Sequence, residues 1–202
     1  MSFSRRLRCG LALIAVLALA ACAPVRVRED ANTQRAQSER EAQIAPLQDW
    51  ALDAHLGVSN GDDGGSGQLS WKQNGDTYEF TVRAPVTGKT WRLHGDGRAA
   101  TLEGVRDVAS HDRDASVLLE REVGWHVPMD ELRYWVRGLR APTSKAQVTY
   151  DENGLPAVLE QAGWKVEYRD WFAKGSPLLP RKVFASHAKF RVRLVIEQWQ
   201  AP

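Results

Sequence analysis

Few side chains in this 202-residue chain have the spacing of a metal-binding, nucleotide-binding or catalytic motif. The histidines occur singly, without metal-ligand spacing, and no Cys-x-x-Cys pair accompanies them: His55, His94, His111, His126 and His187. Thr87-Gly88-Lys89-Thr90 resembles the end of a phosphate-binding loop, but Arg83 stands where that loop needs its first glycine. We therefore expect no metal, no cofactor and no enzyme activity.

Cys22 is the exception, because it follows the pattern of an export signal. Arg5, Arg6 and Arg8 precede an apolar run over residues 10–21 that ends in small side chains. This run is much shorter than the roughly 20 residues that a membrane-spanning helix needs. Leu19-Ala20-Ala21-Cys22 resembles a bacterial lipobox, in which the thiol receives a diacylglycerol and the signal is cleaved before it. We predict a lipoprotein signal over residues 1–21 and a lipid anchor at Cys22.

Cleavage at this position changes the charge and the thiol content of the mature chain. It removes Cys9 and three of the 27 basic residues, so that the 25 acidic residues outnumber the basic ones by one. The remaining thiol is acylated, so the fold must be stable without a disulfide. A nucleic-acid-binding domain carries a basic excess, and this charge balance gives no reason to expect a nucleic-acid partner.

The residues after the signal suffice for one domain with a sizeable core. Residues 22–46 are rich in Arg, Glu, Gln and Ala, which favours a lipid anchor followed by a tether. A partly helical segment that packs on the domain is an equal alternative. Residues 47–202 are predicted to form the folded domain.

Apolar and polar residues alternate from Trp50 onward, which is typical of half-buried strands. The clearest alternating segments are residues 50–58, 69–71, 78–82, 91–93, 164–168 and 190–196. Asn74-Gly75 and Gly95-Asp96-Gly97 supply turns, and residues 61–67 are predicted to be a mobile hairpin turn. In total we expect about ten or eleven strands.

Two helices interrupt the strands. Asp112 or Asp114 can cap a helix that runs to Glu122, and a second helix opens at residues 128–130 and ends before Gly138. A large antiparallel sheet curls strongly, because twist accumulates from strand to strand. We therefore predict a mainly β fold of the α+β class: a curled antiparallel sheet that forms an incomplete barrel of about eleven strands, with a helical lid over an apolar cavity. A solid core under the lid is the alternative.

Several segments, taken in order, resemble the LolB family of outer-membrane lipoprotein receptors. They are Val123-Gly124-Trp125-His126-Val127-Pro128, Trp135-Val136-Arg137-Gly138, Gln161-Ala162-Gly163-Trp164, Leu179-Pro180-Arg181 and Arg193-Leu194-Val195-Ile196 with Trp199. The resemblance implies a receptor, anchored at the periplasmic face of the outer membrane, that takes acylated lipoproteins from the periplasmic carrier LolA and inserts them into outer-membrane lipid. We expect it to act as a monomer and without nucleotide energy.

Two positions depart from the family pattern. Ala54-His55 stands where a Gly-Arg pair is common, which leaves the bend or the pairing of that strand open. Pro85-Val86-Thr87-Gly88 stands where Pro-Leu-Gly is usual. Val86 is the only large apolar side chain in this turn, and we predict that it points into solvent and touches the membrane.

The strand and helix patterns also predict the lining of an acyl-binding cavity. The residues on the apolar sides of these elements are Phe80, Val82, Trp91, Leu93, Leu118, Leu132, Trp135, Trp164 and Val166. Arg133, Arg137 and Arg140 recur at i, i+4 and i+7, which predicts a helix face that meets an acidic rim on the carrier. A solvated charged face is the alternative interpretation of these arginines.

Two other classes of function stay open. A lipid-anchored periplasmic hydrolase needs a nucleophile and a base that residues distant in sequence bring together. A lipid-anchored scaffold for envelope proteins needs a solid core and an exposed interaction patch.

Overall fold

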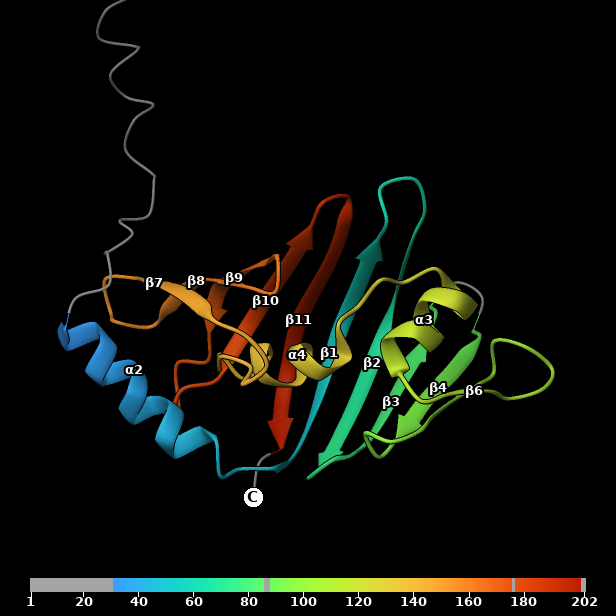
Figure 1. Ribbon diagram of the computed structural model, residues 1–202, viewed down its shortest axis with the longest axis horizontal. Coiled ribbons are helices and arrows are strands. Elements are labelled where there is room, and N and C mark those ends of the chain that lie inside the picture. The colour runs from blue at the N-terminus through green and yellow to red at the C-terminus, as the bar shows by residue number, and fades with distance from the viewer. Residues whose placement is uncertain (1–30, 86–87, 176, 201–202) are drawn as a thin grey trace, which may run out of the picture.

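The computed structural model describes residues 31–85, 88–175 and 177–200 (Figure 1). The predicted signal, Cys22 and Val86 lie outside these residues. The described part contains three helices: α2 (Ala31–Ile44), α3 (Ala115–Val123) and α4 (Met129–Trp135). The strands are β1 (Asp49–Ser59), β2 (Gly64–Asn74), β3 (Thr77–Arg83), β4 (Thr90–Gly95), β5 (Ala100–Glu103), β6 (Ser110–Asp112), β7 (Ala146–Tyr150), β8 (Pro156–Gln161), β9 (Trp164–Trp171), β10 (Pro180–His187) and β11 (Phe190–Gln200).

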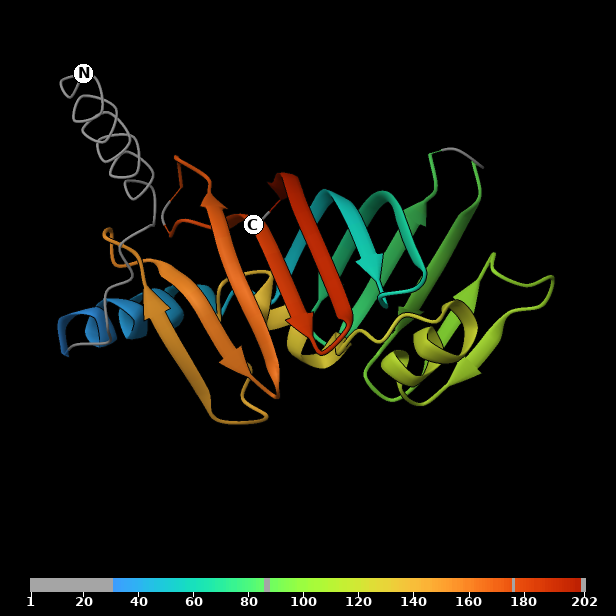
Figure 2. The ribbon, with the colours of Figure 1, turned by 90° about the horizontal axis from the view of Figure 1, so that it is seen from above.

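All eleven strands belong to one antiparallel sheet in the order β6-β5-β4-β3-β2-β1-β11-β10-β9-β8-β7. Pairing of β1 with β11 joins the first and last strands at the centre, and a meander extends from each of them. The sheet is strongly curved but open, since its two edges are β6 and β7 (Figure 2). The predicted incomplete barrel of about eleven strands with helices over one face is confirmed.

Alternation of burial along the strands places the core on one face of the sheet. In β1, Trp50, Leu52, Ala54, Leu56 and Val58 are all buried, and the residues between them are half-buried or exposed. The pairing of β1 with β11 shifts register at Asp53/Ala54, next to the Ala54-His55 departure noted above. The strand therefore continues through this position with a local irregularity.

The prediction of a mobile turn over residues 61–67 is wrong for its second half. Gly64, Gly65 and Gly67 are the first residues of β2 and pair with β1. Close contacts explain the glycines: a Cβ on Gly67 would lie 2.7 Å from the Arg83 carbonyl oxygen, and one on Gly65 would lie 3.1 Å from the Trp125 ring. The glycines thus allow close approach of neighbours rather than a flexible loop.

The two predicted helices form as expected. Asp114, rather than Asp112, caps α3, since its side chain accepts hydrogen bonds from the backbone N–H groups of Ser116 and Val117. Gly124 ends the helix at a φ of 71° in the left-handed region. Helix α4 ends at Trp135, and Gly138 has a φ of 72°. Both helices lie across the same face of the sheet (Figure 1).

Helix α2 packs on the domain, which decides between the two alternatives for this segment. Gln37, Arg40 and Ile44 recur on one side of the helix and are buried. The Arg40 guanidinium donates hydrogen bonds to the carbonyl oxygens of Gly138 and Arg137, both at 2.8 Å, and to that of Leu178 at 3.1 Å. Hydrogen bonds from Arg40 therefore attach α2 to residues 137–138, which follow α4.

Candidate functional site

The nine residues predicted to line an acyl cavity all lie in the core between the curved sheet and the helices. Eight of them are buried, and the ninth, Trp91, is partly buried and packs against the others. Leu118 comes from α3, and Leu132 and Trp135 come from α4; the other six come from β3, β4 and β9. The structure thus brings the predicted set together from five elements.

These nine side chains are part of one packed core, and the open space lies beside it. A hollow of about 320 Å³ opens beside α3 and α4, where Tyr78, Met129 and Arg133 are among its lining residues. Burial, together with the carboxylates of Asp130, Asp114 and Asp96, raises the pKa of Tyr78 to about 12. The open space therefore lies outside the packed set of nine residues.

Buried hydrogen bonds hold the end of α4 against the sheet. The indole N–H of Trp135 donates to Gln161 Oε1 at 2.9 Å, and the Trp135 carbonyl accepts a hydrogen bond from the Tyr168 hydroxyl at 3.0 Å. Gln161 Oε1 also accepts from the backbone N–H of Ala141, and Gln161 Nε2 donates to the carbonyls of Ala141 and Ser144. The helix end is thus fixed to β8 and β9.

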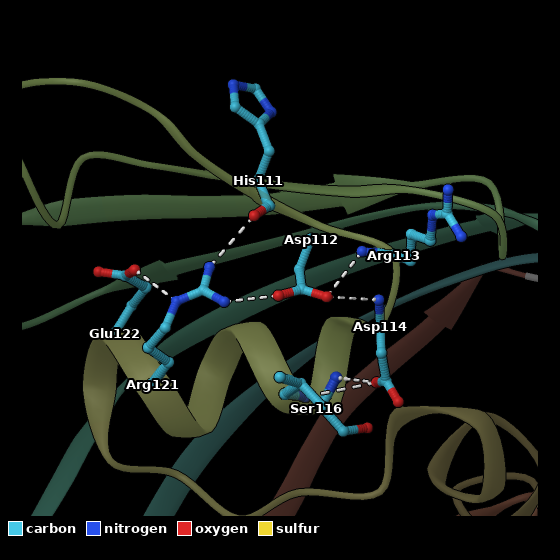
Figure 3. Close-up of polar contacts among 8 residues, drawn as sticks. His111, Asp112, Arg113, Asp114, Ser116, Arg121 and Glu122 are labelled. Carbon is cyan, nitrogen blue, oxygen red and sulfur yellow. Dashed lines mark hydrogen bonds and ion pairs between the residues drawn. The ribbon is translucent and has the colours of Figure 1, made fainter.

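A second polar cluster, at the sheet edge, holds α3 (Figure 3). The Arg121 guanidinium binds the Asp112 carboxylate of β6 at 2.5 Å and the Glu122 carboxylate at 3.1 Å. The same Asp112 carboxylate accepts hydrogen bonds from the backbone N–H groups of Arg113 and Asp114. The Arg121 hydrogen bond and these backbone donors lower the pKa of Asp112. Asp112 therefore links the helix to its entry turn.

Residues 124–128, here called the strap, connect α3 to α4 across the sheet. Trp125 packs edge-on against Trp91 with ring centroids 5.3 Å apart, over Gly65. His126 stacks on Trp164 at 6.2 Å and contacts Phe190 at 4.7 Å. The strap thus touches both halves of the sheet, and we call α3, the strap and α4 together the lid.

The three arginines predicted to share an exposed helix face do not form one. Arg137 is only 7% exposed, and burial lowers its pKa to about 10. Arg140 lies beyond the end of α4 and makes a bidentate pair with Glu41, with one distance of 2.8 Å. Arg133 pairs with Asp76 at 3.1 Å. The spacing rule fails here because α4 ends at Trp135, two residues before Arg137.

The sequence analysis did not identify Gln161 and Arg40. Gln161 binds the end of α4 and the chain after it, and Arg40 binds the chain after α4. Burial lowers the pKa of Arg40 to about 10, and its side chain stacks on Trp171 at 4.7 Å. A polar residue at an inward position of β8 was the available signal for Gln161, and the i, i+3, i+7 spacing of Gln37, Arg40 and Ile44 was the signal for a packed α2.

Within the described ranges, no helix has the length and apolar content needed to cross a bilayer. The same residues contain no group of three or more His, Cys, Asp or Glu side chains placed to hold a metal ion.

The fold is that of an open, curved antiparallel sheet with helices across its apolar face. A solved structure titled as a putative outer membrane lipoprotein-sorting protein domain from Vibrio parahaemolyticus has this fold, with a TM-score of 0.52. Its sequence is 12% identical, and the match covers 84% of this chain and 91% of that one. At this identity, the likeness shows the fold alone.

Sequence comparison defines the family. The outer-membrane lipoprotein LolB of Xanthomonas campestris pv. campestris (strain 8004) is 35% identical over 83% of this chain and 79% of its own length. The LolB proteins of Chromohalobacter salexigens and Alkalilimnicola ehrlichii are 34% and 35% identical over 98% and 96% of this chain, and over 91% and 98% of their own lengths. The model of the family described as outer membrane lipoprotein LolB matches residues 48–199. The chain belongs to the LolB family of outer-membrane lipoproteins, which confirms the predicted family and localisation.

Proposed function

We propose that this outer-membrane lipoprotein accepts acylated lipoproteins from the periplasmic carrier LolA and inserts them into the outer membrane. One observation carries the proposal: the apolar face of a curved sheet is covered by two short helices instead of a second sheet. Such a cover can move as a unit while the sheet stays intact.

The energetics of acyl chains favour this role. Burial of an acyl chain gains about 0.8 kcal/mol per CH₂ group, so a lipoprotein must pass from one apolar surface to another. Helices of nine and seven residues are too short to be stable alone, so their position depends on packing. Acyl chains can take the place of the side-chain contacts that now hold the lid.

The transfer requires no catalytic group and no nucleotide. It runs downhill when the receptor binds the chains more tightly than the carrier and the membrane holds them more tightly still. We propose that the protein is not an enzyme and acts as a monomer.

Three segments outside the core complete the proposal. Residues 1–21 serve as the signal, Cys22 carries the acyl anchor, and residues 22–46 connect it to the domain of residues 47–202. Val86 touches the membrane from the turn between β3 and β4, whose base is closed by a hydrogen bond from the Ala84 N–H to the Lys89 carbonyl at 2.9 Å. The Cys22→Ser variant is expected to remain soluble or uncleaved while the domain folds unchanged.

The test uses the full chain in detergent with a lipopeptide whose acyl chains carry bromine, which quenches tryptophans in contact with it. We expect stoichiometric binding and quenching that decreases in Trp164→Phe. Leu132→Asp is expected to abolish binding, whereas Val117→Asp, the same kind of change at an α3 side chain that is 48% exposed, is expected to leave it unchanged.

Circular dichroism controls for folding of the Leu132 variant. Binding by folded Leu132→Asp equal to that of the wild type would contradict the proposal. If this variant unfolds, tryptophan quenching in the wild type tests the proposal instead. No quenching and no binding would favour an envelope scaffold, and turnover of the lipopeptide would favour a hydrolase.

A further inference from the structure

A small hollow of about 90 Å³ lies where the chain after α2, the β2–β3 turn and the end of α4 meet. We call it the edge hollow; Trp50, Gln73, Asp76, Arg133 and Arg137 are among its lining residues. Trp50 belongs to the packed core, but none of the nine predicted acyl-binding residues lines the edge hollow.

Two lining side chains carry N–H donors without an acceptor. Trp50 is only 5% exposed, and its Nε1 has no hydrogen-bond partner among the described residues. The buried Nε atom of Arg133 likewise has no partner there. Because an unpaired buried donor is costly, such atoms usually bind ordered water or a ligand.

Arg137 adds a buried positive charge to the same wall. Its Nε and Nη1 atoms donate to the backbone carbonyls of Arg133 and Leu47 at 3.1 and 2.8 Å. Its guanidinium also lies over the rings of Trp50 and Tyr134, each at 5.6 Å, and within the described part of the chain no carboxylate pairs with it. A buried cation without a counter-charge is unfavourable, so this guanidinium favours an anionic ligand.

The charge balance of the edge hollow is positive. Asp76 is the acidic residue in its lining, and Asp76 Oδ1 already accepts a hydrogen bond from Arg133 Nη1 at 3.1 Å. The Asp76 side chain is 81% exposed, so solvent screens its charge more than that of Arg137. Two guanidinium groups therefore face one solvated carboxylate.

We infer that the edge hollow binds a phosphate group through the donors of Trp50, Arg133 and Arg137. The four oxygens of phosphate can satisfy donors that come from three side chains, and guanidinium groups bind phosphate in bidentate geometry. The volume is that of roughly three water molecules, which suits one small oxyanion. The larger hollow shares Gln73, Asp76 and Arg133, so the rest of a phosphate ester can extend into it.

This inference goes beyond the proposed function and does not depend on it. Two sources of the group are compatible with the site: free phosphate, and the headgroup of a phospholipid. The edge hollow lies at the β2–β3 turn, at the opposite end of β3 from the turn that contains Val86. A headgroup would therefore be held far from the predicted membrane contact.

The test follows the indole N–H signal of Trp50 in the nitrogen-15 NMR spectrum of the full chain in detergent. Trp50→Phe assigns this signal by removing it. We expect inorganic phosphate, titrated at constant ionic strength against chloride, to shift the signal to saturation. Calorimetry on the same samples gives the affinity of the variants.

Arg137→Lys keeps the positive charge but removes the planar guanidinium and its Nη2 donors, and we expect about tenfold weaker phosphate binding. The control Arg83→Lys changes an exposed arginine on β3, and binding should stay unchanged. Trp50→Phe keeps an aromatic side chain but removes the pyrrole ring with its N–H donor, so it tests the site if Arg137→Lys does not fold. A severalfold loss is expected for it.

A shift with phosphate alone supports a free-phosphate site, and a shift that also occurs, at lower concentration, with short-chain phosphatidylglycerol added to the detergent supports a headgroup site. The inference is overturned if chloride and phosphate move the signal equally, or if no shift occurs. It is also overturned if Arg137→Lys and Trp50→Phe both bind phosphate as the wild type does.

Discussion

Replacement of Gln161 by leucine tests whether the polar contacts beneath α4 hold the lid. Gln161 is 2% exposed and uses both ends of its amide in four hydrogen bonds. Leucine fills a similar volume but removes all four. It leaves the Trp135 indole N–H, the Ala141 N–H and the Ala141 and Ser144 carbonyls without this partner.

The expected cost follows from the number of lost hydrogen bonds. Each buried bond contributes about 1 kcal/mol net, so Gln161→Leu should lower the free energy of unfolding by about 4 kcal/mol. That is a large part of the stability of an ordinary domain, which is about 5–15 kcal/mol. Gln147→Leu, at an exposed position of the neighbouring strand β7, should change it by less than about 0.5 kcal/mol.

Urea unfolding of the full chain in detergent, followed by circular dichroism, measures both variants. Hydrogen exchange then separates local from global effects: the amides of α4 should lose more protection than those of the central strands β1 and β11. A Gln161→Leu protein within about 1 kcal/mol of the wild type, with unchanged exchange in α4, would refute the reasoning.

Three further predictions concern α2, the strap and the membrane turn. Burial raises the pKa of Glu41, but hydrogen bonds from Arg140 and Gln37 outweigh burial and hold it below 4.5. Around and below pH 4.5, the unfolded chain therefore binds more protons than the folded one, so the free energy of unfolding should fall as the pH drops below 4.5. The midpoint of thermal unfolding should depend less on pH in Glu41→Gln than in the wild type. Gly65→Ala places a methyl group 3.1 Å from the Trp125 ring, which should displace the strap and raise hydrogen exchange in residues 124–128 without unfolding the sheet. Val86→Glu should leave acceptance of cargo from the carrier intact and slow its insertion into liposomes, which a two-stage transfer assay measures; equal insertion would rule out a role for the turn.

The strands and helix ends could be predicted because their signals are local. Burial on one face repeats every second residue in β1, so Trp50 and Leu52 identify the strand without knowledge of its partners. Asp114 and Gly124 mark the ends of α3 through hydrogen bonds and backbone angles within a few residues. Such signals are independent of the rest of the fold.

Features that depend on distant neighbours could not be predicted in the same way. Residues 64–67 have the composition of a turn, yet contacts with Trp125 and Arg83 make glycine necessary within a strand. The partners of Arg40 lie at Arg137, Gly138 and Leu178, far along the chain. Spacing alone reveals neither kind of contact.

The proposed role as an acyl receptor requires a core that stays packed beneath the lid until an acyl chain enters. Moving the lid away would expose Leu118 and Leu132 to water, at a cost of about 1.5–3 kcal/mol for each side chain. The hydrogen bonds of Gln161 and Tyr168 would add to that cost. An acyl chain can offset it, because each buried CH₂ group gains about 0.8 kcal/mol. Opening and lipid binding are therefore expected to occur together, so that the apolar face meets either the lid or the cargo and not the aqueous periplasm.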